Sequence, residues 1–215
     1  MLKIYGRATS SNVQLVMWTV GELGLAYDRL DYGHAHGGLE TDAYGAMNPH
    51  RKVPVLCDGQ AVVWESAAIL RYLATRYGDG GVFWPSEPAA RAQVDMWAEW
   101  GKMTLSQGFT VPIFWSRVRT AAKDRDAAAL ARAIAQFDTH LLRVSDQLAD
   151  QPYICGSDFT AADIVVGHLL YRWFDMEILR APNPVVEAYY QRLTGRPAYA
   201  EHVMVSYDTL RVEGA

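Results

Sequence analysis

The type of hydrophobic pattern changes once along this 215-residue chain, close to Pro88. Before that point short apolar runs alternate with amphipathic stretches of helical period, and after it only helical periods remain. A segment rich in glycine and proline, residues 79–87, separates the two parts. The change predicts an α/β domain over residues 1–78 and an all-helical domain over residues 88–215.

The first part reads as a small mixed sheet flanked by helices. Asp58-Gly59 is a hairpin signal, so the two runs around it form one antiparallel pair. The resulting order is β-α-β-α-β-β-α. Strands are expected at residues 2–5, 27–31, 53–57 and 61–65, and helices at 13–25, 41–47 and 66–77.

The second part reads as a helical bundle, with helices expected at residues 89–119, 124–150, 160–174, 184–193 and 198–205. The third of these is apolar nearly all round, which is typical of a central, buried helix. Thr160 and Asp163 form a capping box at its start, and Phe159 and Ile164 form a hydrophobic staple. We therefore expect Asp163→Ala to destabilise the fold by about 1–2 kcal/mol or more.

Composition narrows the classes of function. Half of the chain is hydrophobic, a fifth is charged, and the formal net charge is −4. This balance gives no basic surface for nucleic acid or an anionic membrane, and the most apolar window, residues 164–174, is too short to span a bilayer. No signal peptide is evident and Cys57 and Cys155 have no metal or disulfide spacing, so we expect a cytoplasmic protein with buried, reduced thiols.

Four small polar residues, Thr9, Ser10, Ser11 and Asn12, lie between the first strand and the first helix. Such a tetrad is commonly a helix cap. It also places hydroxyl and amide donors at the positive end of a helix, where a thiolate is stabilised. The tetrad alone leaves both interpretations open.

Two further motifs in the same domain have a structural and a functional interpretation. Val53-Pro54 is either an ordinary edge-strand proline or a cis peptide that exposes the backbone of Val53 to an extended peptide ligand. Glu65-Ser66 is either a helix start or a site where the helix N-terminus binds a carboxylate and Glu65 holds an ammonium group.

Together these motifs make the whole chain resemble a cytosolic glutathione S-transferase of the serine type. The resemblance rests on RATSSNVQ (7–14), NPHRKVPVL (48–56), WESAAILRYL (64–73) and FTAADI (159–164). It implies an α/β thioredoxin-like N-terminal domain plus an all-α C-terminal helical bundle, with glutathione as co-substrate.

The resemblance also implies roles for particular residues. Val53, before Pro54, would pair with the cysteinyl backbone of glutathione. Glu65 and Ser66 would hold the γ-glutamyl end, and Lys52 the glycyl carboxylate. Ser10 is expected to contact the sulfur, with Ser11, Thr9 and Asn12 as open alternatives.

The helical domain would supply the rest of the site. The resemblance implies an electrophile pocket that includes Met103, Phe109, Phe114 and Trp115, and a homodimer in which Glu99 reaches the glutathione ammonium of the neighbouring subunit. At least half of the four pocket residues could equally be core. His34 and His36 have the spacing of a metal pair, but no third ligand is evident, so no metal is expected.

We therefore expect a glutathione transferase that activates the glutathione thiolate for attack on a hydrophobic electrophile. Glutathione-dependent isomerisation, dehalogenation or peroxide reduction would use the same thiolate. A non-catalytic glutathione-binding or interaction protein is the alternative from a different class. A thioredoxin-type redox protein is disfavoured, since the first helical turn contains no cysteine.

Overall fold

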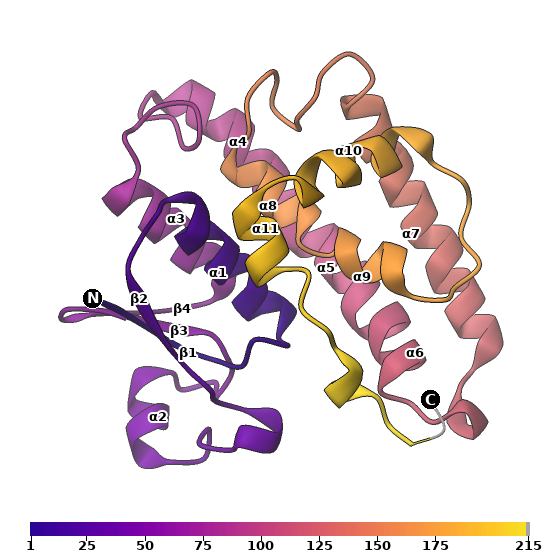
Figure 1. Cartoon of the computed structure of the whole chain (residues 1–215), viewed down its shortest axis with the longest axis horizontal. Coiled ribbons are helices and arrows are strands. Elements are labelled where there is room, and N and C mark those ends of the chain that lie inside the picture. Colours follow the sequence, from indigo (N-terminus) through magenta and orange to yellow (C-terminus); the bar gives the residue numbers. More distant parts are fainter. Residues whose placement is uncertain (214–215) are drawn as a thin grey trace.

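The computed structural model describes residues 1–213 and has the fold class expected from the sequence (Figure 1). Its sheet has the strand order β2-β1-β3-β4, in which β1 is parallel to β2 and the other neighbours are antiparallel. The strands are β1 (Leu2–Tyr5), β2 (Tyr27–Leu30), β3 (Val55–Asp58) and β4 (Ala61–Trp64). Each begins within two residues of its expected start.

Helices cover both faces of this sheet. α1 (Ser11–Glu22) and α3 (Ser66–Tyr77) pack on each other on one side, and α2 (Asp42–Met47) lies on the other (Figure 1). The turn η1 (His34–His36) precedes α2. α1 and α3 both begin at the same edge of the sheet as the loop before β3, so three polar segments that are far apart in sequence meet there.

The rest of the described chain is helical. Its elements are α4 (Pro88–Trp100), η2 (Gly101–Leu105), α5 (Ser106–Phe109), η3 (Thr110–Trp115), α6 (Ser116–Val118), η4 (Ala122–Asp124), α7 (Ala127–Gln147), α8 (Ala161–Gly167), α9 (Leu170–Asp175), α10 (Pro184–Thr194), α11 (Pro197–His202) and η5 (Asp208–Leu210). The expected helix 160–174 is thus two helices, separated at His168 and Leu169. The expected helical domain ends at residue 215, and its last two residues lie outside the described part.

The expected helix 89–119 is one continuous helical path, but two of its segments, η2 and η3, are π-helical. Pro112 lies within η3 and cannot donate a backbone hydrogen bond, which favours the wider π turn there. π segments inside α-helices are frequent at functional sites. Both segments face the cavities described below.

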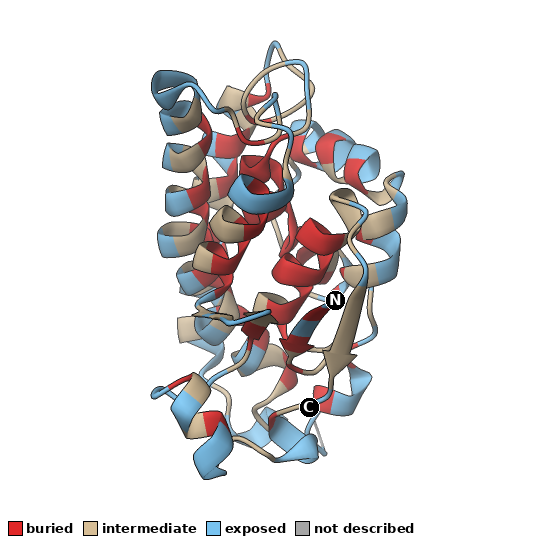
Figure 2. Cartoon of the chain, turned by 90° about the vertical axis from the view of Figure 1, so that its left-hand side faces the viewer, coloured by how far each residue is buried: buried red, intermediate tan, exposed pale blue. Residues whose placement is uncertain are grey.

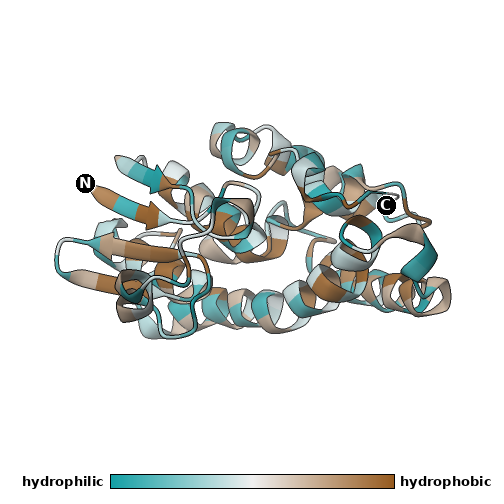
Figure 3. Cartoon of the chain, turned by 90° about the horizontal axis from the view of Figure 1, so that it is seen from below, coloured by the Kyte–Doolittle hydropathy of each residue, from teal (hydrophilic) through white to brown (hydrophobic). Residues whose placement is uncertain are grey.

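The core runs from the sheet into the helical domain. Every residue of α8 is buried, as its all-round apolar sequence predicts (Figure 2). α7 buries only one stripe, Ile134, Phe137, Leu141 and Val144, and hydropathy alternates along the outer helices (Figure 3). Across the domain junction, the Trp18 ring of α1 lies 5.5 Å from Phe159 and 4.6 Å from Tyr199. None of the helices within residues 1–213 combines the length and apolarity needed to cross a bilayer.

Candidate active site

The N-terminus of α1 presents the polar tetrad that the sequence singled out. Ser10 is the N-cap residue, and its side chain makes no capping hydrogen bond. Asn12 lies in the first turn, where its Oδ1 accepts a hydrogen bond from Lys102 Nζ at 2.5 Å and one from Ser66 Oγ at 3.4 Å. The free N–H groups of this helix end and the Ser10 hydroxyl are therefore available to a ligand.

The Val53–Pro54 peptide bond is cis, as the functional interpretation of that motif required. The preceding carbonyl, that of Lys52, accepts hydrogen bonds from Tyr44 Oη at 2.9 Å and Asn48 Nδ2 at 2.8 Å. β3 begins only at Val55, and within residues 1–213 the backbone of Val53 forms no hydrogen bond. Its N–H and C=O can thus pair with an extended ligand.

Glu65 forms a one-residue corner between β4 and α3, with φ +70° and ψ 120°. A non-glycine residue in this region costs of the order of 1–3 kcal/mol and is concentrated at functional sites. Ser66 is the first residue of α3 and is only 1% exposed. The N-terminus of α3 and the Glu65 side chain are therefore placed together in the first cavity, which is described below.

Lys102, in η2 of the helical domain, is a site residue that sequence reasoning missed. Besides its hydrogen bond to Asn12, it faces Glu65. Burial lowers the pKa of the Lys102 ammonium, and the charge of Glu65 opposes that shift. No local motif marks Lys102, because it lies 90 positions from Asn12 in the sequence. The sequence offered only one indication, a single lysine close to the apolar face of a predicted helix.

These groups line a first cavity of about 660 Å³. Of the predicted residues it brings together Asn12, Lys52, Val53, Pro54, Glu65, Ser66 and Met103, and Lys102 joins them. The arrangement offers a carboxylate, two cations, an unpaired backbone segment and helix N-termini. It can hold a small peptide that carries both an ammonium group and carboxylates.

A second cavity of about 360 Å³ adjoins the first, and Asn12, Lys52 and Val53 line both. Thr9, Ser10, Ser11, Phe114 and Trp115 line only this one. Leu210, from the C-terminal segment, closes it on one side. The second cavity therefore lies beside the N-terminus of α1, next to the first cavity.

The predicted electrophile pocket needs a correction at Phe109. This residue is 1% exposed, packs against Phe137 at 5.3 Å, and lines neither cavity. Its side chain packs toward α7, so Phe109 is a core residue. Met103 is 54% exposed and lines the first cavity rather than the second.

Glu99 lies outside both cavities. Its Oε2 forms an ion pair with Arg71 Nη2 at 2.6 Å, and Arg71 also pairs with Asp95 at 2.7 Å. This cluster is on the surface of the same chain, so the structure does not bring Glu99 to the glutathione site of its own subunit.

The remaining candidates fall outside the site. His34 and His36 lie in η1, and no group of three metal-ligating side chains occurs among the described residues. Both cysteines are free and half-buried rather than fully buried. Burial raises the pKa of Cys57 and raises that of Cys155 to about 11, so neither thiol is a ready nucleophile.

Comparison with known protein families identifies the family of the chain. Residues 4–81 match the model of the glutathione S-transferase N-terminal domain, and residues 127–192 match that of the C-terminal domain. Glutathione S-transferase GstB of Escherichia coli is 34% identical over 207 residues, covering 95% of this chain and 99% of that protein. The chain belongs to the glutathione S-transferase family.

A solved structure extends this relationship to the ligand. The theta class glutathione S-transferase of Xanthomonas axonopodis pv. citri, in its glutathione-bound crystal structure, superposes with a TM-score of 0.90 at 43% identity, covering 95% of this chain and 98% of the other. A more distant relative, dichloromethane dehalogenase of Methylorubrum extorquens, is 28% identical over 168 residues, which is 70% of this chain and 56% of that protein.

Proposed function

We propose that this glutathione S-transferase family member binds glutathione in the first cavity and joins it, through its sulfur, to an electrophile in the second. The observation that carries the proposal is the position of Asn12. This residue lines both cavities at the N-terminus of α1, so a sulfur atom beside it is in reach of a reactant on the other side.

The first cavity supplies matching groups for each part of glutathione. The γ-glutamyl carboxylate meets the N-terminus of α3 at Ser66, and its ammonium meets Glu65. The cysteinyl backbone pairs with Val53, before Pro54. The glycyl carboxylate meets Lys52, which is a suitable point charge.

The reaction depends on favouring the thiolate, since a free thiol of pKa about 8.5 is mostly protonated at neutral pH. Ser10, or the neighbouring Thr9, Ser11 or Asn12, donates a hydrogen bond to the sulfur. The N–H groups of α1 add their partial positive charge. Each unit by which the pKa of the thiol falls corresponds to about 1.4 kcal/mol in favour of the anion.

The test compares Ser10→Ala, Ser11→Ala and Asn12→Ala. We expect Ser10→Ala to raise the pKa of bound glutathione by about one unit, measured from thiolate absorbance against pH, while the Kd for glutathione changes little. A shift confined to Ser11→Ala or Asn12→Ala would assign the contact to that residue. If neither these three variants nor Thr9→Ala shifts this pKa, none of the four side chains stabilises the thiolate.

The spectrum of reactions needs a separate assay. Aryl halides, epoxides, isothiocyanates and hydroperoxides distinguish transfer from dehalogenation and peroxide reduction, all of which start from the same thiolate. Failure to bind glutathione in affinity capture would instead favour a non-catalytic interaction protein.

A homodimer in the cytoplasm completes the proposal. In a dimer built across the two domains, the exposed Glu99 could turn from Arg71 toward the glutathione ammonium of the other subunit. Light scattering of the purified chain tests the dimer. Glu99→Gln should weaken glutathione binding only if the dimer forms.

A further inference from the structure

The second cavity is strongly basic although the chain as a whole is acidic. Five cationic side chains line it, Arg7, Arg51, Lys52, Arg119 and Arg172, and no acidic side chain does. None of the five has a carboxylate within ion-pair distance among residues 1–213. A pocket for purely apolar reactants has no need of this charge.

Arg172 is the most deeply placed of the five and is only 3% exposed. Its Nη2 donates to the Thr9 carbonyl at 2.7 Å, and its Nε has no hydrogen-bond partner in the described chain. The guanidinium lies 4.3 Å from the centre of the Phe114 ring. The pKa of Arg172 is lowered to about 10, mainly by burial and also by the nearby charge of Arg7, while Tyr207 opposes the shift.

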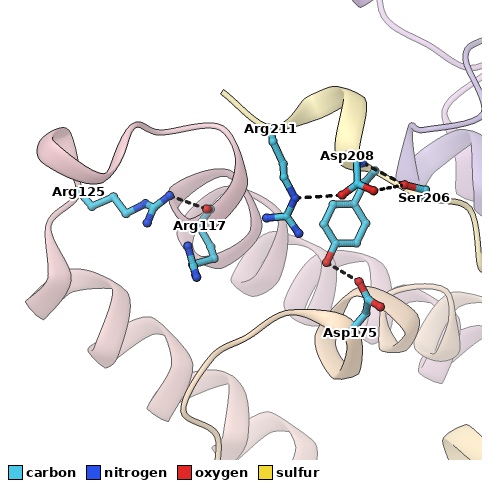
Figure 4. A network of polar contacts seen from close by, with 7 residues as sticks. Arg117, Arg125, Asp175, Ser206, Asp208 and Arg211 are labelled. Atoms are coloured by element: carbon cyan, nitrogen blue, oxygen red, sulfur yellow. Dashed lines mark hydrogen bonds and ion pairs between the residues drawn. The ribbon is translucent and has the colours of Figure 1, made fainter. Parts of the chain in front are cut away.

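Two carboxylates, Asp175 and Asp208, are engaged with the C-terminal segment, which also supplies Leu210 to the cavity (Figure 4). Asp175 accepts a hydrogen bond from Tyr207 Oη at 2.7 Å. Asp208 accepts from Ser206 Oγ at 2.8 Å and from Arg211 Nε at 3.0 Å. Neither carboxylate forms an ion pair with Arg172, which has no counter-ion among residues 1–213.

Two more arginines extend the basic wall toward the rim. The Nε of Arg7 is buried without a partner. Both Arg7 and Arg119 line the cavity; burial lowers the pKa of Arg7, and the positive charge of Arg119 lowers it further. Arg119 stacks on Trp115, with its guanidinium 4.7 Å from the ring centre.

A buried charge without a counter-ion costs several kcal/mol, and this cost is offset when an anion enters. The planar arginine fork matches a carboxylate, with which it forms two parallel hydrogen bonds. The three arginines come from the loop after β1, from the turn that follows α6 and from α9, and none of them lines the first cavity. Arg51 differs, because its guanidinium donates to the carbonyls of Leu39 and Thr41.

We propose that Arg7, Arg119 and Arg172 form a carboxylate-recognition site in the electrophile cavity, which selects electrophiles that carry a carboxylate group. This inference rests on the proposed function, since it names the substrate class for the same reaction. With an aryl chloride, the glutathione thiolate attacks the carbon that bears chlorine. The C–S bond forms, the C–Cl bond breaks and chloride leaves, while the carboxylate stays on the arginines unchanged.

The test uses a matched pair of compounds, a chlorodinitrobenzoate and the corresponding chlorodinitrobenzamide. Binding of their glutathione conjugates by calorimetry measures recognition without requiring turnover. We expect the carboxylate conjugate to bind about tenfold or more tightly than the carboxamide conjugate. For each compound, kcat/KM is divided by the rate constant of the uncatalysed reaction. This normalised value should also be higher for the carboxylate than for the carboxamide.

Variants assign the preference to the arginines. Arg119→Gln and Arg7→Gln should each reduce the carboxylate-to-carboxamide ratio several-fold. Arg117→Gln is the matched control, because it removes the same charge two residues away, where the side chain donates to the Glu177 carbonyl at 3.3 Å instead of facing the cavity. The ratio of this control should equal that of the unmodified chain. Arg172→Lys retains the positive charge but loses the planar guanidinium that forms two parallel hydrogen bonds. It tests the role of Arg172 if neutral variants at this buried position do not fold.

Three distinguishable outcomes would contradict either the carboxylate site or the proposed transferase function. Equal binding of the two conjugates contradicts carboxylate selection and leaves the transferase proposal intact. If Arg119→Gln weakens glutathione but not γ-glutamylcysteine, the arginines hold the glycyl carboxylate and the inference is wrong. If neither conjugate nor glutathione binds, the proposed function itself fails.

Discussion

The side-chain amide of Asn12 can adopt only one orientation in this site. Lys102 can only donate hydrogen bonds, so the oxygen of the amide must face its ammonium group. The Nδ2 group then points elsewhere, and no described residue accepts a hydrogen bond from it. Lys102 thereby leaves Asn12 with a free donor at the junction of the two cavities, beside the hydroxyl of Ser10.

Lys102→Met tests this arrangement. Loss of the ammonium group removes a positive charge near the sulfur and releases the Asn12 amide, so we expect the pKa of bound glutathione to rise by roughly one unit. Turnover at pH 7 should fall about tenfold, with partial recovery at higher pH, which a merely structural role would not produce.

Lys123→Met is the control for Lys102, because it removes the same charge from η4, away from both cavities. It should behave as the unmodified chain does. An unchanged thiol pKa in Lys102→Met would show that this lysine only fills space.

At the level of elements, the start of α8 depends on one buried carboxylate. Asp163 is fully buried and accepts four hydrogen bonds, at 2.8–3.0 Å, from Thr160 N and Oγ1, Ile154 N and Tyr189 Oη. The capping box expected from the sequence is present. The contacts from Ile154 and Tyr189 are additional, and they tie α8 to a loop and to α10.

Asp163→Ala should therefore destabilise the fold more than the loss of an ordinary helix cap does. Several buried donors lose their acceptor at once, so we expect the free energy of unfolding to fall by roughly 3–5 kcal/mol. Urea unfolding followed by tryptophan fluorescence measures the change. Asp158→Ala is the matched control, since that exposed carboxylate bonds only to Ser157, and its midpoint should hardly move. Equal midpoints for the two variants would disprove the structural role.

The two π segments show why elements, rather than single residues, shape the site. η2 carries Lys102 to the first cavity, and η3 carries Thr110 and Trp115 to the second. An ordinary α-helical period over residues 89–119 would not predict these placements. Phe109 was expected in the pocket from the family resemblance, and its packing against Phe137 in the core corrects that expectation.

On the scale of the whole molecule, the two domains are joined through α1. Glu22 accepts two hydrogen bonds from Arg196, at 2.7 and 2.6 Å, and a third from Trp18 Nε1 at 2.8 Å. The Arg196 guanidinium also lies 3.7 Å from the centre of the Phe159 ring. Since the N-terminus of α1 also lines both cavities, this junction helps to position the proposed active site.

A double-mutant cycle on Glu22→Gln and Arg196→Met measures the junction. The pair is bidentate and largely shielded, with side-chain exposures of 12% and 28%, so we expect a coupling energy of about 1–2 kcal/mol in urea unfolding. The exposed pair Asp208–Arg211, at 76% and 42%, is the comparison. Its coupling energy should be within about 0.5 kcal/mol of zero. Equal coupling in both cycles would mean that Glu22–Arg196 does not join the domains.

The sequence by itself determined the element order, the class of each domain and the motifs proposed to bind glutathione. Those features are local, because period-2 and period-3.6 patterns, Asp58-Gly59, Val53-Pro54 and the capping box each lie within a few residues. Only the tertiary structure decided that Lys102 meets Asn12 and that Arg7, Arg119 and Arg172 share one cavity. These groups are separated by tens to more than a hundred positions, and their meeting depends on how the helical domain packs against α1. Burial leaves Arg7 and Arg172 few partners, and this is the basis for the proposed carboxylate site.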